Sequence, residues 1–209
     1  MNKIHRSFSY LNIILLLVLL MSIILNINHI EVGAATSWKG YAVYRDGVFN
    51  TYDYHAAMMV EDTRVNKSKP IIHAVGYFSP VRLDTWSEFM GGKNFVGICK
   101  PKNCTINSTL ANSFVSKARE LNGISYTVLD QIDYHSGTSK VTPSQITDLR
   151  CDGVIEYVYE YYGYRVGGSD ANWDITKNTS ANKTQHSGLR ITPKEQCNYW
   201  LTKVSTNLP

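Results

Sequence analysis

Short apolar runs alternate with polar segments through the first half of the chain and predict four β-strands. Each run has four to eight residues and is bounded by turn-forming or charged residues, as is typical of strands. Residues 45–47 predict a turn, and the polar residues 61–70 predict a hairpin loop. The four predicted strands are residues 41–44, 55–60, 71–78 and 94–99.

The spacing of apolar positions then changes to that of an amphipathic helix over residues 108–121. Asn122 and Gly123 follow directly and predict a C-terminal cap. One face of such a helix needs apolar residues three and four positions apart. In this segment they are Leu110, Phe114, Val115, Ala118 and Leu121.

A second helix is predicted to begin near Asp148 or Leu149 and to end at Gly163. Residues 167–188 are rich in Gly, Asn, Ser and Thr and predict a loop, which a short final element around residues 197–201 follows. Strands that precede helices indicate an α+β fold. We therefore expect a small antiparallel sheet with helices that cover one of its faces.

The first 35 residues have the pattern of a secretory signal peptide, which leaves 174 of the 209 residues for one domain, residues 36–209. A basic start with Lys3 and Arg6 precedes the apolar residues 11–27, and small residues follow at 33–35. The alternative is an uncleaved anchor, since 17 residues are at the short end for crossing a bilayer. Both interpretations predict a secreted or cell-wall-associated domain.

Charge and hydropathy exclude two classes of protein. The chain has a net charge of +4, or +3 without its first 35 residues, and it has no cluster of Lys and Arg. We therefore expect no nucleic-acid partner. The segment after the signal holds no second long apolar stretch, so we expect no stable membrane insertion after signal cleavage.

Two of the four cysteines are close in sequence. Disulfides are the default in an exported protein, and Cys99 and Cys104 could close a small loop, although Cys197 could pair with any of the others. Cys151 differs because it lies in the first turn of the predicted second helix. It would be the third helical residue if Asp148 is the N-cap.

The position of Cys151 gives it a possible chemical role. The partial positive charge of a helix N-terminus favours a thiolate and lowers the thiol pKa. Its side chain falls on the apolar face, so the sulfur is expected to point toward the sheet, and Gly153 leaves room for another backbone or a substrate. The alternative is that Cys151 is a buried apolar residue or half of a disulfide.

His55 and His73 lie in two successive predicted strands. In a hairpin that places them opposite each other, the imidazoles share one face, although Pro70 requires an edge position or a bulge. Together with Cys151, the two histidines allow either a nucleophilic triad or a zinc site. The alternative is that both imidazoles form hydrogen bonds within the sheet and have no function. Their intervals of 18 and 78 residues lack the short spacing of zinc ligands, so no metal or other cofactor is expected. The histidines expected at the surface are His135 and His186.

Three motifs resemble segments of a known family. His-Ala-Ala-Met-Met-Val at 55–60 with Ile-Ile-His-Ala at 71–74 resembles its paired strands, and Cys-Asp-Gly-Val-Ile at 151–155 resembles its nucleophile helix, usually Cys-Ser-Gly-Leu-Val. Gly-Tyr-Ala-Val-Tyr at 40–44 resembles the strand upstream. The family is that of the NlpC-type cell-wall cysteine peptidases, within the papain-like superfamily. The histidine strands precede the cysteine helix here, so the order is similar to that of the circularly permuted branch, which includes lecithin retinol acyltransferase-like proteins.

The resemblance implies a thiol hydrolase of papain-like, permuted fold. In that family Cys151 would attack an amide or ester carbonyl, His55 would take the thiol proton and His73 would orient His55. The N–H of Cys151 and the hydroxyl of Tyr126 would stabilise the oxyanion. The implied substrate is a peptide of the bacterial cell wall. The alternatives are a lipid or ester acyl hydrolase or transferase, and a secreted glycan- or wall-binding protein without activity. Asp152, Ala57 and the segment 79–104 depart from the family pattern.

Overall fold

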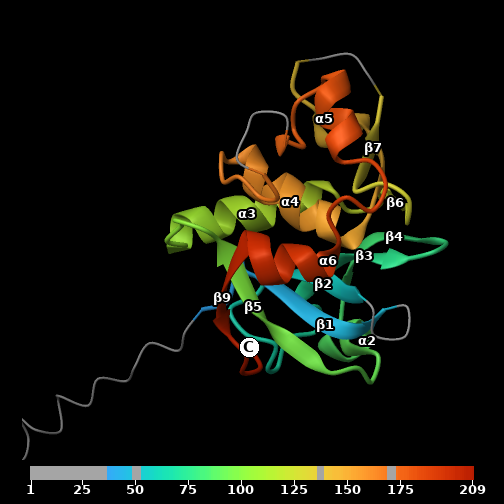
Figure 1. The fold of residues 1–209 in the computed structure, drawn as a ribbon. Coiled ribbons are helices and arrows are strands. Elements are labelled where there is room, and N and C mark those ends of the chain that lie inside the picture. Colours follow the sequence, from blue (N-terminus) through green and yellow to red (C-terminus); the bar gives the residue numbers. More distant parts are fainter. Residues whose placement is uncertain (1–36, 49–52, 136–138, 169–172) are drawn as a thin grey trace, which may run out of the picture. The chain divides into compact units, whose positions relative to one another are not determined.

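The computed structural model describes residues 37–48, 53–135, 139–168 and 173–209, which belong to one compact unit, Ser37–Pro209 (Figure 1). The predicted signal peptide lies outside the described residues. Within this described part of the chain, no helix is both long enough and apolar enough to cross a membrane.

The central layer is a six-stranded antiparallel sheet of order β4-β3-β2-β1-β5-β9, which confirms the α+β fold class. All four predicted strands are present. The predicted turn at 45–47 is wrong, because β1 continues through it, and β4 was not predicted. The strands are β1 (Ala42–Val48), β2 (Asp53–Met59), β3 (Ile71–Gly76), β4 (Ser79–Asp84), β5 (Phe95–Pro101) and β9 (Leu201–Ser205).

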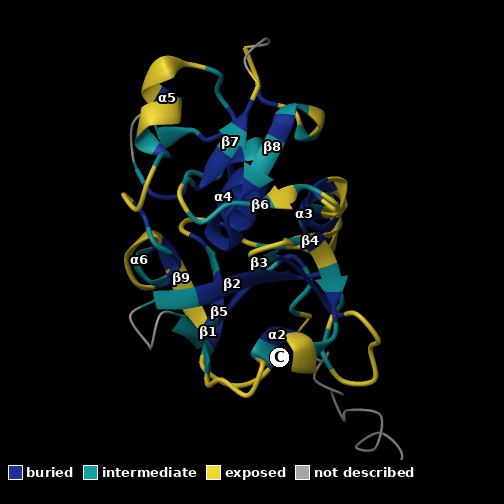
Figure 2. Ribbon diagram, turned by 90° about the vertical axis from the view of Figure 1, so that its right-hand side faces the viewer, coloured by how far each residue is buried: buried dark blue, intermediate teal, exposed yellow. Residues whose placement is uncertain are grey.

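Helices cover both faces of this sheet, whereas the sequence predicted that they cover one. α3 (Ser108–Glu120) and α4 (Cys151–Tyr161) lie on one face, and the short α2 (Trp86–Met90) lies on the other (Figures 1 and 2). The difference arises from residues 79–104, the segment without a counterpart in the family pattern, which supply α2.

The two faces of β2 therefore belong to different cores. Side chains alternate between the faces of a strand. Ala56 and Met58 pack in the core under α3 and α4, and Ala57 and Met59 pack with Phe89 of α2. His55 and His73 share the face of Ala57 and Ile71, so they lie on the α2 side of the sheet.

α3 follows the prediction, with Asn107 as its N-cap; the Asn107 side chain accepts a hydrogen bond from the Leu110 N–H at 2.9 Å. α4 begins later than predicted. Its N-cap is Arg150, and Cys151 is its first residue rather than its third. Asp148 is not the cap, because it lies in β8 (Ile146–Leu149).

β8 belongs to a second, three-stranded sheet that leads into α4. Its neighbours are β6 (Ser125–Tyr126), which is parallel to it, and β7 (Ile132–Tyr134), which is antiparallel. The expected closeness of another backbone at Gly153 is confirmed. A Cβ there would lie 1.9 Å from the carbonyl oxygen of Gln131.

The C-terminal third contains more helix than predicted. Residues 167–188, predicted as a loop, include α5 (Ser180–Gln185), which is short and polar and so lacks an apolar periodicity. The predicted final element is the π-helical turn η3 (Gln196–Trp200) followed by β9. The remaining short helices are η1 (Pro143–Gln145) and α6 (Pro193–Glu195).

Candidate active site

The structure brings His55 and His73 together, as the hairpin prediction expected. His55 Nε2 lies 2.7 Å from His73 Nδ1, and both residues are buried. The register pairs Met58 with Ile72 and Met59 with Ile71, so the two histidines are diagonal neighbours rather than directly opposite. They still share one face, because both are an even number of residues from the pairing of Met59 with Ile71.

Asp84 of β4 extends this pair and was not predicted. Its Oδ2 lies 2.9 Å from His73 Nε2, and its Oδ1 accepts a hydrogen bond from Arg82 Nε at 2.8 Å. The carboxylate is buried, with Arg82 more exposed beside it. The result is a continuous chain of hydrogen bonds from Asp84 through His73 to His55.

This chain determines which ring nitrogens carry hydrogen when both imidazoles are neutral. A carboxylate only accepts, so His73 Nε2 donates to Asp84. His73 Nδ1 then has no hydrogen and accepts from His55 Nε2. The nitrogen of His55 left without hydrogen is Nδ1, which is therefore free to accept a proton.

The surroundings of the two rings favour the neutral form. Burial, followed by the charges of His73 and Arg45, holds the pKa of His55 well below its usual value. Burial also lowers the pKa of His73, although Asp84 opposes this effect. Arg45 pairs with His55 across β1 and β2 and donates from Nε to the Phe89 carbonyl, so its positive charge is fixed nearby.

Cys151 lies at the start of α4, which packs against β2, and its charge is one of those that raise the pKa of Arg45. It belongs to the core beneath α4, and the backbone N–H of Ala56 is close enough to its sulfur to lower the pKa of the thiol. That N–H is part of the peptide between His55 and Ala56. Among the described residues, no hydrogen bond joins the sulfur to either imidazole. The expected orientation of Cys151 toward the sheet is confirmed, and only 4% of the residue is exposed.

The expected lowering of the thiol pKa is not found. Burial and the charge of Asp152 raise the pKa of Cys151 to about 12, while the Ala56 N–H and Arg150 act in the opposite direction. The helix N-terminus favours a thiolate, but desolvation of a buried charge is the larger effect. Cys151 is therefore a neutral thiol at neutral pH in this conformation.

Tyr126 lies where the second sheet approaches Cys151. It is half-buried in β6, and burial together with the nearby Cys151 raises its pKa, so the phenol keeps its proton. Tyr126 also lines a cavity of about 540 Å³. The other lining residues include the turn between β3 and β4, with Tyr77 and Phe78 at its tip.

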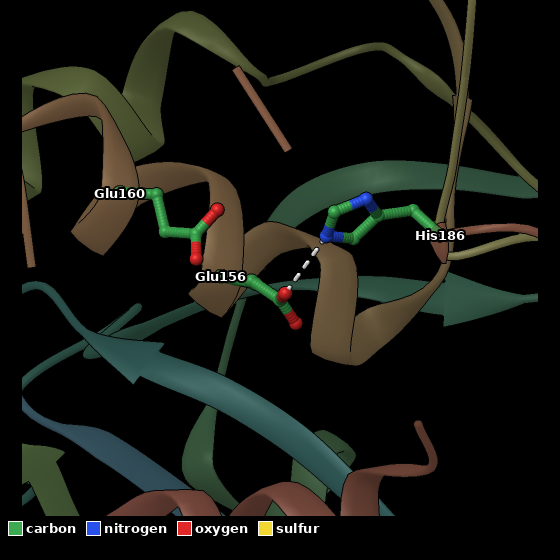
Figure 3. Close-up of side chains that lie close together, drawn as sticks. All are labelled: Glu156, Glu160 and His186. Carbon is green, nitrogen blue, oxygen red and sulfur yellow. Dashed lines mark hydrogen bonds and ion pairs between the residues drawn. The ribbon is translucent and has the colours of Figure 1, made fainter. Parts of the chain in front are cut away.

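A second buried cluster lies behind Cys151 along α4. Its carboxylates, Asp152, Glu156 and Glu160, are four residues apart, so they share one helix face. Arg150 pairs with Asp152 through Nε at 2.7 Å and Nη2 at 2.9 Å. His186 Nε2 lies 3.1 Å from Glu156 Oε1. Figure 3 shows the His186 ring facing the Glu156 carboxylate.

His186 was expected at the surface, and this expectation is wrong, since only 2% of the residue is exposed. Its Nδ1 faces the carbonyl oxygen of Asn182 at 2.8 Å and must donate, so a proton is also needed between Nε2 and Glu156. Burial alone lowers the pKa of His186, but Glu156 together with the backbone of Asn182 and Trp173 outweighs burial and raises it. His135, by contrast, is exposed as predicted.

Glu156, Glu160 and His186 are also a possible set of metal ligands. One ligand atom from each lies within 4.8 Å of the others. Both Glu160 oxygens accept backbone N–H groups, from Val166 at 2.9 Å and Ile175 at 2.6 Å. Since protein donors already occupy these atoms, the cluster is an internal network that holds α4 to the C-terminal third of the chain.

The cysteines are placed differently from the expected bridge. All four are thiols, and Cys99 lies next to Cys197, with the two sulfurs 3.5 Å apart, rather than next to Cys104. The reason is that β5 directs Cys99 toward η3. The Cys104 sulfur instead interacts with Tyr164.

Comparisons of the chain with protein-family models, with curated proteins and with solved structures found no match. The site therefore rests on its own geometry. Sequence reasoning named Cys151, His55, His73 and Tyr126. It did not name Asp84 and Arg45, which the structure places beside His73 and His55. The alternation in residues 81–84, with Arg82 between Val81 and Leu83, is a weak strand signal that could have indicated Asp84.

Proposed function

We propose that the protein is a thiol hydrolase that cleaves amide bonds, with Cys151 as nucleophile and His55 as general base. The observation that carries the proposal is the chain of hydrogen bonds from Asp84 through His73 to His55. It ends at the peptide between His55 and Ala56, which lies next to Cys151. The Ala56 N–H of that peptide is close enough to the Cys151 sulfur to lower the pKa of the thiol, and His55 forms the other side of the peptide. Nucleophile, base and orienting group are the three parts of such a site.

The proton path follows from the tautomers. His55 Nδ1 takes the proton of the Cys151 thiol while the sulfur attacks the substrate carbonyl, and later protonates the leaving amine. His73 holds His55 through Nε2, and Asp84 holds His73. Because the thiol and both imidazoles are neutral before reaction, proton transfer accompanies attack, and no thiolate–imidazolium pair exists in the resting enzyme.

The resting structure must rearrange before this proton can move. Among the described residues no hydrogen bond joins the Cys151 sulfur to the His55 ring, so the reaction requires a movement that brings Nδ1 of His55 and the sulfur within hydrogen-bond distance. Both residues are also almost fully buried. A movement near Tyr126 would in addition open the cavity lined by this residue to the sulfur.

Two features supply the rest of the reaction. The N-terminus of α4 has no side-chain cap, so its first N–H groups are suited to a developing oxyanion. The Tyr126 hydroxyl is a second donor near Cys151, because its phenol keeps its proton.

We propose a cell-wall peptide as the substrate and a location outside the cytoplasm, on the basis of the family resemblance and the signal-like first 35 residues. An acyl ester of a lipid is a second candidate. It is favoured by the exposed aromatic tip of the β3–β4 turn, where Phe78 is fully exposed and Tyr77 is 71% exposed, beside the cavity lined by Tyr126. Such a tip suits an apolar substrate.

The test is release of new amino groups from purified peptidoglycan by the purified protein, its Cys151→Ala variant and its Cys104→Ala variant. We expect release by the parent protein and by Cys104→Ala, and none by Cys151→Ala. Equal release by the parent and Cys151→Ala would overturn the proposal. The second candidate would be favoured if no protein released amino groups from peptidoglycan and the parent protein, but not Cys151→Ala, hydrolysed a short-chain phospholipid ester. Binding to peptidoglycan without any hydrolysis would show a binding protein.

A further inference from the structure

Cys99 and Cys197 are the two thiols that the proposed mechanism does not use and that lie in contact. Cys99 is in β5, Cys197 is in η3, and 98 residues separate them. Their sulfurs are 3.5 Å apart, and both residues are buried, with 0% and 1% exposed. Nothing else about this cluster requires two adjacent cysteines, since a pair of small apolar residues would fill the same space.

We propose that Cys99 and Cys197 form a disulfide that fixes η3 to the sheet, while Cys151 and Cys104 stay thiols. A disulfide has sulfurs about 2.05 Å apart, so each sulfur has to move by only about 0.7 Å. The backbone is already suitable, because Cys99 pairs with Lys203 between β5 and β9, immediately after η3. This inference does not depend on the proposed hydrolase activity.

The surroundings of Cys197 favour the reaction. A thiolate is the attacking species in thiol–disulfide exchange. The hydrogen bond between the Cys99 and Cys197 sulfurs and the nearby Lys203 lower the pKa of Cys197 in spite of burial. At Cys104 burial outweighs the opposing effects of Tyr164 and Lys100, so the pKa of this thiol is raised.

The bond forms by exchange with a small disulfide oxidant such as glutathione disulfide while the chain folds and Cys197 is still accessible. The Cys197 thiolate attacks one glutathione sulfur, and one glutathione thiolate leaves. The Cys99 thiol then loses its proton and displaces the second glutathione. Two protein thiols are oxidised to one disulfide, and one glutathione disulfide is reduced to two thiols.

The consequence reaches the Cys151 helix through the residue before Cys197. Gln196 is fully buried, its Oε1 accepts from the Tyr44 hydroxyl at 2.7 Å, and its Nε2 donates to the Asp152 carbonyl at 3.1 Å. A disulfide at Cys197 therefore holds Gln196 against the start of α4. The bond would fix the position of the residues around Cys151 without including the nucleophile.

The experiment is refolding of the purified protein from urea in a buffer of reduced and oxidised glutathione, followed by alkylation with iodoacetamide under denaturing conditions. Peptide mapping by mass spectrometry without reductant is expected to find one linked pair of peptides, containing Cys99 and Cys197, and alkylated Cys104 and Cys151. A link between any other two cysteines would overturn the proposal, as would alkylation of all four.

Thermal unfolding provides the second readout. Oxidised protein is expected to melt about 5–15 °C above protein kept reduced with dithiothreitol, because the bond restricts the unfolded chain over a long loop. Cys104→Ser is the matched control and should keep this difference, and Cys99→Ser should abolish it. An equal shift in Cys99→Ser would contradict the assignment of the bond. If Cys99→Ser does not fold, Cys197→Ser serves the same purpose.

Discussion

Two buried histidine clusters lie on opposite faces of the main sheet, and the pKa values of their histidines are shifted in opposite directions. On the α2 face, the pKa values of His55 and His73 are lowered. On the α4 face, the pKa of His186 is raised. All three side chains are buried to a similar degree, so burial alone does not explain the difference.

The difference lies in the charges that face each ring. Arg45 and the neighbouring imidazole oppose a positive charge on His55, and Asp84 is one residue further along the relay. His186 faces Glu156 directly, within a row of three buried carboxylates that has Arg150 as its permanent cation. The first environment favours neutral imidazoles. The second holds a proton between His186 and Glu156, because Glu156 raises the pKa of His186 while burial raises the pKa of Glu156. The contrast therefore separates the cluster that we propose to be reactive from a network that holds α4 to the C-terminal third.

The largest expected effect comes from His55→Gln. Without the ring there is no group to accept the Cys151 proton, so hydrolysis should fall by about 10²- to 10⁴-fold. The free energy of unfolding should change much less, because glutamine is also a hydrogen-bond donor and acceptor. The measurements are the hydrolysis rate and urea unfolding of the same preparation, with His135→Gln at the exposed histidine as control. Unchanged hydrolysis in His55→Gln would remove His55 from the mechanism.

The opposite result is expected for Arg150→Met on the α4 face. This change leaves Asp152 buried without its cation, which should lower the free energy of unfolding by about 3–5 kcal/mol. Arg82→Met is the control, since its guanidinium is 44% exposed beside a buried carboxylate on the other face, and it should cost about 1 kcal/mol or less. Equal losses of unfolding free energy in Arg150→Met and Arg82→Met would show that the α4 cluster does not stabilise the fold more than the ion pair on the other face.

The smallest effect is in the pH dependence of stability, where the two clusters should act with opposite sign. His186, with its raised pKa, stabilises the fold below about pH 6.5, and this contribution is lost as the pH rises through its folded-state value. His55 and His73, with lowered pKa values, resist protonation in the fold. The unfolded chain binds those protons first, so they reduce stability as the pH falls below about 6.5.

Urea unfolding between pH 5 and 8 measures both slopes. Removing the ring in His186→Gln should make the fold relatively more stable at the alkaline end of this range. His73→Gln should make it relatively more stable at the acidic end. Each change should be on the order of 1 kcal/mol. Slopes that move in the same direction in both variants would contradict the contrast between the clusters.

Local patterns were sufficient to predict much of this molecule. Alternation predicted that His55 and His73 would share a face, and helical spacing predicted that Cys151 would point inward. These features depend on residues near one another in sequence. The predicted start of α4 was wrong because it depends on residues distant in sequence. Asp148 resembles an N-cap locally, but pairing with Ser125 and Asp133 holds it in β8.

Electrostatic features depended on contacts that spacing does not encode. Glu156 meets His186 across 30 residues of sequence, so a histidine in a polar segment became buried. Asp84 meets His73 only because β4 forms. The rule that a helix N-terminus lowers a thiol pKa failed at Cys151, because it takes no account of full burial.

The central claim is that His55 is neutral at pH 7, with hydrogen on Nε2 and with Nδ1 free to accept a proton. The most direct measurement is the ¹⁵N NMR spectrum of protein labelled at its histidine ring nitrogens, assigned with His55→Gln, His73→Gln and His186→Gln. We predict neutral Nε2–H tautomers for His55 and His73 and a doubly protonated ring for His186. A doubly protonated His55, or one with its only hydrogen on Nδ1, would contradict this account.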